Sequence, residues 1–127
     1  MCIRDSGGIP VVRKEQHFIG VPAVIDKDRV SSLLAIKLEA EALIISTAID
    51  AVRTGFGTDA EEVHRTLSLD ACERHLESGE FPPGSMGPKI GSLMEAALHR
   101  PGLQAVLCQP GDALDALRGN AGTTIVV

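Results

Sequence analysis

Two lysines, each set among residues typical of a helix start, are the strongest chemical signals in the sequence. Lys27 stands between Asp26 and Asp28, directly after an apolar run. Backbone N–H groups at a helix start favour anions, and an ammonium group meets a phosphate as a point charge. Asp28 could hold lysines in place, help a metal ion, or only cap the helix. The pattern alone favours the N-cap beside a solvated lysine.

The second lysine ends the stretch Gly84-Ser-Met-Gly-Pro-Lys89. Its glycines permit positive φ or close backbone approach, and Pro88 suits a first helical turn. Lys89 then lies at the electrostatically wrong end of a helix for a cation, unless an anion sits between the lysine and the helix. A Gly/Pro loop with a solvated lysine explains the stretch about equally well. The chemical interpretation requires both ammonium groups to converge on one polyanion.

Other candidate sites are weaker. The chain has no GxxxxGK[ST] phosphate loop and no GxSxG, and Ser6-Gly-Gly8 is too short to cradle a phosphate alone. The four histidines are scattered without ligand-like spacing, so we expect no metal cluster. The three cysteines form no CxxC, which fits a reducing cytosol. Glu61 and Glu62 are expected on a solvated helix face.

Composition excludes several classes of protein. The chain has 127 residues, of which 44% are hydrophobic and 23% charged, and this predicts one soluble globular domain. Twelve Lys+Arg against seventeen Asp+Glu give a net charge of −5, and there is no Trp or Tyr. A nucleic-acid binder needs a basic surface and stacking aromatics, which are lacking here. No apolar run reaches the roughly 18 residues of a membrane span.

Helices alternate with apolar strands along the sequence, and these elements must position the two lysines. β-branched runs at 9–13 and 17–21 predict a hairpin. Apolar periodicity predicts helices over 28–40, 68–77, from about 85 to the Pro101-Gly102 stop, and over 112–117. Continuous apolar runs predict strands over 42–46, 103–108 and 123–127. On the first helix, the recurring apolar residues are Val30, Leu33, Leu34, Ile36 and Leu38.

This order of elements predicts an α/β fold with a mostly parallel sheet flanked by helices. In such sheets ligands bind beyond the carboxyl ends of the strands. The exit from the 42–46 strand, at Ser46-Thr47, and the loop before Asp28 are therefore where we expect the chemistry.

Together the motifs resemble carbamate kinase, of the amino-acid kinase superfamily. The pairing of Val24-Ile-Asp-Lys-Asp28 with Gly84-Ser-Met-Gly-Pro-Lys89 is what makes the resemblance specific. The other matching stretches are Gly7-Gly-Ile-Pro-Val11, Gly20-Val-Pro-Ala23, Thr47-Ala-Ile-Asp-Ala-Val52, Glu80-Phe-Pro-Pro83 and Ala121-Gly-Thr-Thr-Ile125. The resemblance covers 7–127, which is well under half of a typical family member. It implies that 7–127 is a C-terminal, nucleotide-binding lobe, while 1–6 is a foreign or misassembled start and the chain a fragment.

The resemblance implies an ATP–carbamate phosphotransferase that works reversibly with carbamoyl phosphate, uses Mg²⁺, acts in the cytoplasm in arginine metabolism, and forms a homodimer when full length. By this resemblance, Lys27 would approach the nucleotide phosphates and Asp28 would hold the catalytic lysines in place. Lys89 would neutralise charge on the transferring phosphoryl group. No protein ligand to the metal is expected. Gly7 and Gly8 would be the tail of a glycine run at the substrate. The nucleotide site would be lined by Thr47, Ala48, Ile49, Asp50 and Val52, with Met86 and Gly87 nearby.

Departures from the family pattern leave alternatives open. A common form of the strand-exit motif in the family is T-D-V-D-x-V-Y, whereas here Ala48 replaces the first Asp and Arg53 the Tyr. The N-terminal glycine-rich segment and a further lysine of the family are missing, so we expect the chain alone to be inactive. One alternative is a non-catalytic nucleotide-binding or regulatory module of the same fold. Another is a related kinase that phosphorylates acetylglutamate, glutamate or aspartate.

Overall fold

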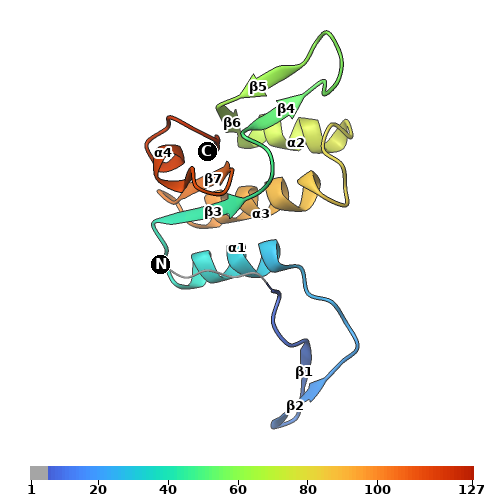
Figure 1. Ribbon diagram of the computed structural model, residues 1–127. Helices are drawn as coiled ribbons and strands as arrows, with labels where there is room; N and C mark the ends of the chain where they lie inside the picture. The colour runs from blue at the N-terminus through green and yellow to red at the C-terminus, as the bar shows by residue number, and fades with distance from the viewer. Residues whose placement is uncertain (1–5) are drawn as a thin grey trace.

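The computed structural model describes residues 6–127, which form an α/β unit preceded by an extended hairpin (Figure 1). Residues 1–5 of the predicted foreign start lie outside the described part. The elements in chain order are β1 (Val11–Lys14), β2 (His17–Gly20), α1 (Lys27–Lys37), β3 (Ala42–Ser46), β4 (Val52–Thr54), β5 (Glu62–His64), β6 (Thr66–Ser68), α2 (Leu69–Glu77), α3 (Met86–His99), β7 (Gln104–Cys108), α4 (Ala113–Leu117) and β8 (Thr123–Val126).

The main sheet has four strands in the order β3-β7-β8-β6. Strand β7 runs parallel to β3, and β6 runs parallel to β8, while β7 and β8 are antiparallel. The predicted α/β class and mostly parallel sheet are therefore confirmed. The larger core cluster joins this sheet to α1, α2 and α3, and a smaller cluster joins β7 to α4. The helices thus flank the sheet on both faces, as the alternation of elements predicted.

The predicted hairpin is present and projects away from the sheet (Figure 1). Strands β1 and β2 pair antiparallel, with Val11 opposite Gly20 and Lys14 opposite His17. All eight strand residues are exposed. The hairpin therefore brings no side chain into the core, and its function here is to connect the Gly7-Gly8 segment with the start of α1.

The buried face of α1 is not the one that its apolar residues predict. Leu33 and Leu38, two of the apolar residues that recur at helical spacing, are 52% and 70% exposed. The buried residues of α1 are Asp28, Ser32 and Ala35. Helix α1 lies along α3, whose own buried residues include Ser92 and Ala96. Small side chains on facing helices allow the backbones to approach closely, so residue size and the partner of Asp28 decided the face.

Three short strands were not predicted. Strands β4 and β5 pair antiparallel, with Val52 opposite His64, and β6 forms the edge of the main sheet beside β8. Each has three residues, which is too short for a period of two to stand out in the sequence. The stretch that was expected to be a solvated helix face, Glu61-Glu62, is instead the entry into β5. Tertiary pairing, rather than local propensity, made these strands.

The two cysteines within the described residues are buried, and this predicts how they react. Cys72 is 0% and Cys108 1% exposed. Desolvation raises the pKa of both thiols, that of Cys72 to about 11. The thiolate is the reactive form. In a Cys2→Ser variant, we therefore expect no reaction with an aromatic disulfide reagent at pH 8 until urea unfolds the chain. Rapid labelling of either thiol in the folded protein would contradict this burial.

Candidate active site

The two helices that carry the candidate lysines lie side by side and run in the same direction (Figure 1). Their first turns meet through Asp28 and Lys89, and their far ends meet where the Arg100 side chain donates to the Glu39 carbonyl. Both helix N-termini therefore lie at one end. The partial positive charges of two helix dipoles add there, at the edge of the molecule where an anion is most favourable.

Asp26, and not Asp28, caps α1. Its Oδ1 accepts from the backbone N–H groups of Asp28, at 2.9 Å, and Arg29, at 3.0 Å. A carboxylate that accepts two such bonds satisfies donors that no residue of the helix can reach. The two aspartates that flank Lys27 therefore have different roles. Asp26 caps the helix, and the Asp28 carboxylate can bind a partner outside its own helix.

That partner is Lys89 on α3. The Lys89 Nζ donates to Asp28 Oδ2 at 2.8 Å, and the two side chains are only 17% and 10% exposed. The lysine was expected to need an anion at the start of its helix, and the Asp28 carboxylate is such an anion. Breaking a largely buried pair leaves one charge without compensation, which is costly. The pair therefore holds the two first turns together.

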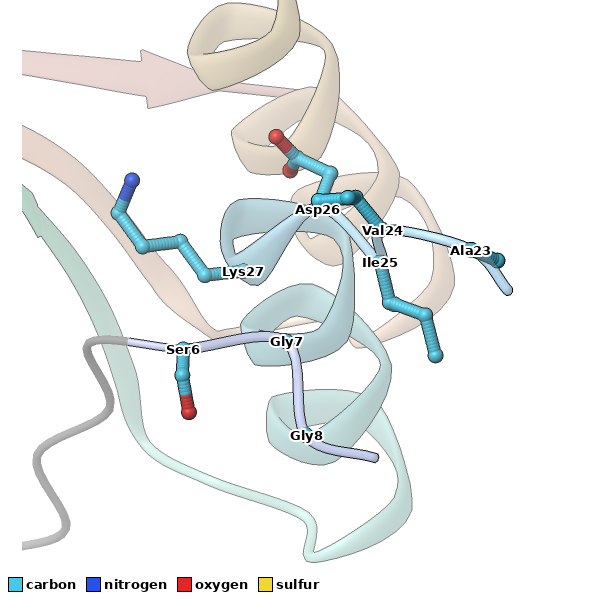
Figure 2. Close-up of a pocket in the computed structure, with 8 residues that line it drawn as sticks. All are labelled: Ser6, Gly7, Gly8, Ala23, Val24, Ile25, Asp26 and Lys27. Atoms are coloured by element: carbon cyan, nitrogen blue, oxygen red, sulfur yellow. The ribbon is translucent and has the colours of Figure 1, made fainter. Parts of the chain in front are cut away.

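Lys27 is one of the residues that line a cavity of about 420 Å³, together with Ser6–Gly8 and Ala23–Asp26 (Figure 2). Gly7 is required for this approach, because a Cβ at that position would stand 1.8 Å from the carbonyl oxygen of Ile25. The structure thus brings Gly7 and Gly8 to Lys27. Lys89 is not among the lining residues. The two lysines belong to neighbouring helix starts linked by Asp28, but only Lys27 lines this cavity.

The predicted nucleotide segment, 47–52, leaves the carboxyl end of β3 and is fastened to the end of β7. The Thr47 N–H donates to the Cys108 carbonyl at 2.9 Å, and Gln109 Nε2 donates to the Ala48 carbonyl at 3.2 Å. Because β3 and β7 are parallel, both exits lie at the same sheet edge. Gln109 was not among the predicted site residues; its place directly after an apolar strand was the available signal.

Thr123 of β8 fastens the other end of this segment. Its side chain is fully buried, and its hydroxyl accepts from the Val52 N–H at 2.8 Å while donating to the His64 carbonyl at 2.5 Å. Val52 and His64 are opposite each other at the start of the β4–β5 pair. One hydroxyl therefore binds a donor on β4 and an acceptor on β5. Nothing in the sequence around Thr123 indicates this role.

The other two residues predicted to line the nucleotide site, Met86 and Gly87, are the first two residues of α3. Ile49 and Met86, from the two predicted segments, pack against the same core cluster. Gly87 is buried, and its N–H donates to the Pro82 carbonyl at 3.0 Å. The residue before the helix, Ser85, makes no side-chain cap hydrogen bond. The start of α3 is therefore shaped by its backbone and its glycine rather than by a capping side chain.

Arg53, at the position where the family pattern has Tyr, binds two carboxylates. Its Nη2 contacts both oxygens of Asp50, at 3.1 and 3.2 Å, and its Nη1 contacts Glu61 Oε1 at 2.7 Å. The hydrogen bonds from Arg53 lower the pKa of Asp50 from its ordinary 3.8. The Gly57 N–H and then Arg53 lower the pKa of Glu61 from its ordinary 4.5. Both carboxylates therefore stay ionised and oriented well below neutral pH.

No group of three or more histidine, cysteine or carboxylate side chains converges within residues 6–127. Of the two carboxylates that flank Lys27, Asp26 caps α1 and Asp28 is paired with Lys89. Within residues 6–127 these side chains therefore form no protein cage for a metal ion. In the same part of the chain, no helix is long and apolar enough to cross a membrane.

Comparisons with known proteins show what this chain resembles. The model of the amino acid kinase family matches residues 3–108. Carbamate kinases of Staphylococcus haemolyticus and Clostridium perfringens are both 40% identical to this chain, over 94% and 95% of its length. A carbamate kinase-like protein of Escherichia coli is 41% identical. The chain spans 38–39% of the length of these three relatives.

Solved structures show the same likeness. Carbamate kinase from Giardia lamblia bound to AMP-PNP superposes with a TM-score of 0.89 and 34% identity, over 94% of this chain and 38% of the other. A protein from Aeropyrum pernix superposes with a TM-score of 0.86 and 38% identity, over 95% of this chain and 39% of the other. Uridylate kinase from Archaeoglobus fulgidus shares the fold at 15% identity, with a TM-score of 0.55, over 80% of this chain and 47% of the other.

The role of Thr123 can be tested with two substitutions. Thr123→Val keeps the shape but leaves the Val52 N–H and the His64 carbonyl without a partner, so we expect a loss of about 1–3 kcal/mol in the free energy of unfolding. Thr123→Ser keeps the hydroxyl and is the matched control, with a smaller loss. Urea unfolding followed by circular dichroism measures both. Equal stability of the two variants would show that the hydroxyl is dispensable.

The close approach at Gly7 makes a second prediction. Gly7→Ala places a methyl group on the Ile25 carbonyl, so segment 6–8 must separate from segment 23–27. Gly20→Ala is the control, because a Cβ there meets nothing within 4 Å. In two-dimensional amide NMR spectra, we expect Gly7→Ala to shift the resonances of 23–27, whereas Gly20→Ala leaves them in place. Unchanged 23–27 resonances in Gly7→Ala would contradict the contact.

Proposed function

This chain belongs to the amino acid kinase family, and we propose that it forms the nucleotide-binding part of a phosphotransferase that acts reversibly between ATP and carbamate. The observation that carries the proposal is the buried pair of Asp28 and Lys89, which joins two parallel helix starts directly beside Lys27. Cations and helix N-termini gathered at one place favour a polyphosphate. The relatives at about 40% identity that are named carbamate kinase support carbamate as the acceptor.

The proposed reaction needs positioned cations more than it needs a protein nucleophile. A carbamate oxygen attacks the γ-phosphorus of ATP, the bond from that phosphorus to the β–γ bridging oxygen breaks, and ADP leaves with the electron pair. Negative charge is spread over the transferring group and the bridging oxygen in the transition state. Preorganised positive groups that are held in place before the reaction stabilise that charge without reorganisation. The reverse direction forms ATP from carbamoyl phosphate and ADP.

The three residues at the helix starts have separate proposed roles. Lys27, which is exposed and lines the cavity with Gly7 and Gly8, meets the nucleotide phosphates. Lys89 neutralises the transferring phosphoryl group. An ammonium has three N–H donors, and Asp28 accepts one of those of Lys89, which leaves donors for phosphate oxygens. Asp28 thus fixes the direction of Lys89, without itself touching the substrate.

The nucleotide would lie against the sheet edge formed by 47–52 and the start of α3. Backbone groups of Thr47, Ala48, Ile49, Asp50 and Val52, with Met86 and Gly87, form the proposed lining. The structural neighbour from Giardia lamblia binds the ATP analogue AMP-PNP, which supports a nucleotide as the ligand. Mg²⁺ would arrive on the nucleotide phosphates, where it supplies further positive charge. The remainder of the substrate site, the cytoplasmic location and the homodimer are properties proposed for the longer protein.

Completion of the chain tests the proposal. Residues 7–127 are joined to the N-terminal part of the Clostridium perfringens carbamate kinase, and ATP formation from carbamoyl phosphate and ADP is followed. We expect turnover from the joined protein and negligible turnover from the 127-residue chain, which spans 39% or less of its relatives. A folded, nucleotide-binding but inactive product would favour the regulatory module instead. Activity with acetylglutamate, glutamate or aspartate in place of carbamate would favour the other kinases.

Substitution of Lys89 tests the catalytic assignment in the joined protein. Lys89→Met removes a charge that acts on the transferring phosphoryl group, so we expect kcat to fall about a hundredfold or more. It also leaves Asp28 unpaired, at a cost of roughly 1–3 kcal/mol in stability. Adding Asp28→Asn should recover stability but not activity. Lys37→Met, an exposed lysine at the far end of α1, is the control. Normal turnover with Lys89→Met would overturn the assignment.

A further inference from the structure

The loop 55–61, between β4 and β5, is attached to its surroundings at both of its ends. At one end Arg53 bridges Asp50 and Glu61, with all three contacts between 2.7 and 3.2 Å. Glu61 uses its second oxygen, Oε2, to accept from the Gly57 N–H at 3.1 Å. The nucleotide segment, which contains Asp50, is thereby connected through one guanidinium to the interior of the loop.

At its other end the loop is attached to the segment that leads into α3. The Gly55 N–H donates to Glu80 Oε2 at 2.9 Å. Glu80 directly precedes Phe81, which is 3% exposed and part of the core, and the Pro82 carbonyl accepts from the Gly87 N–H. An exposed carboxylate next to the buried Phe81 therefore holds the loop. Gly55 has a φ of 60° and no room for a Cβ, so its N–H direction depends on glycine.

Hydrogen bonds inside the loop join its two attachments. The Thr58 hydroxyl donates to the Gly55 carbonyl at 2.7 Å, and the Thr58 N–H donates to the same carbonyl at 3.0 Å. The Glu61 N–H donates to the Thr58 carbonyl at 3.2 Å. Successive short-range hydrogen bonds of this kind fix a loop in one conformation. Asp50 and Glu80, which belong to the two segments proposed to face the nucleotide, are thus joined through one continuous set of contacts.

We propose that the loop 55–61 is a brace that sets the spacing of segments 47–52 and 80–87 around a nucleoside diphosphate, with Arg53 as its central positioning residue. The ligand in this inference rests on the proposed function. Single exposed ion pairs contribute little to global stability. A guanidinium shared by two carboxylates that are themselves hydrogen-bonded has few alternative geometries, so its effect is on position. Arg53 is not placed in contact with the reacting atoms.

Binding of ADP to the 127-residue chain, followed by amide NMR titration, tests the brace. We expect Arg53→Met and Glu80→Ala each to weaken ADP binding by about fivefold or more, because either change breaks the same connection. Arg53→Lys, which keeps the charge but reaches one carboxylate at a time, should recover part of the affinity. Arg118→Met is the matched control, because it deletes the same charge from an exposed pair with Asp115 on α4. The urea midpoints should stay close to that of the original chain.

The double variant distinguishes a brace from two independent contacts. If Arg53 and Glu80 act in series, Arg53→Met with Glu80→Ala should bind ADP no more weakly than the weaker single variant. Additive losses, or an affinity of Arg53→Met equal to that of Arg118→Met, would overturn the brace.

Hydrogen exchange separates this inference from the proposed function. If the original chain binds no ADP, the proposed nucleotide site is wrong for the chain alone, but the brace still makes a prediction. Arg53→Met should then speed amide exchange not only at Gly57, whose acceptor Glu61 it frees, but also at Gly55, on the far attachment. Faster exchange confined to Gly57 would mean that the two attachments are not connected, and the brace would be rejected.

Discussion

The pairing of Asp28 with Lys89 is the interaction on which the rest of the site depends. Each charge alone would be costly in its largely buried position, and each compensates the other across two helices. The pair requires that α1 and α3 start at the same end, and this in turn places Lys27 and both helix dipoles there. The capping of α1 falls to Asp26, which directly precedes the helix, whereas Asp28 lies inside the first turn and reaches α3.

A second constraint comes from the sheet. Parallel pairing of β3 with β7 brings their carboxyl ends to one edge, so that 47–52 and Gln109 become neighbours although they are far apart in sequence. The backbone groups of this irregular segment cannot all pair within a strand, and side chains from elsewhere satisfy them. Thr123 is the clearest case, since its one hydroxyl serves both Val52 and His64. The polar residues at this edge therefore have a structural role, because they keep backbone groups from being left unpaired. This role is separate from their proposed contact with a nucleotide.

Prediction from the sequence succeeded where the local signal was strong and failed where partners decided the outcome. The apolar run 42–46 and the stop at Pro101-Gly102 marked β3 and the end of α3, because continuous hydrophobicity and helix-breaking residues act locally. The exposed faces of Leu33 and Leu38 could not be anticipated, because the small residues of α1 pack only once α3 lies beside it. Strands β4, β5 and β6 each needed a partner to exist at all, and Glu61 was misplaced for the same reason.

The amino-acid sequence by itself determined the α/β class, most element boundaries, and the two lysine motifs, because periodicity, glycine, proline and charge are properties of neighbouring residues. Only the tertiary structure decided which carboxylate caps the helix and which binds Lys89, that Gly7 lies against Ile25, and that Arg53 joins Asp50 to Glu61. The physical reason is that an ion pair or a close backbone contact has a defined energy only at a defined distance. For residues that are distant in the sequence, that distance exists only after the chain has folded.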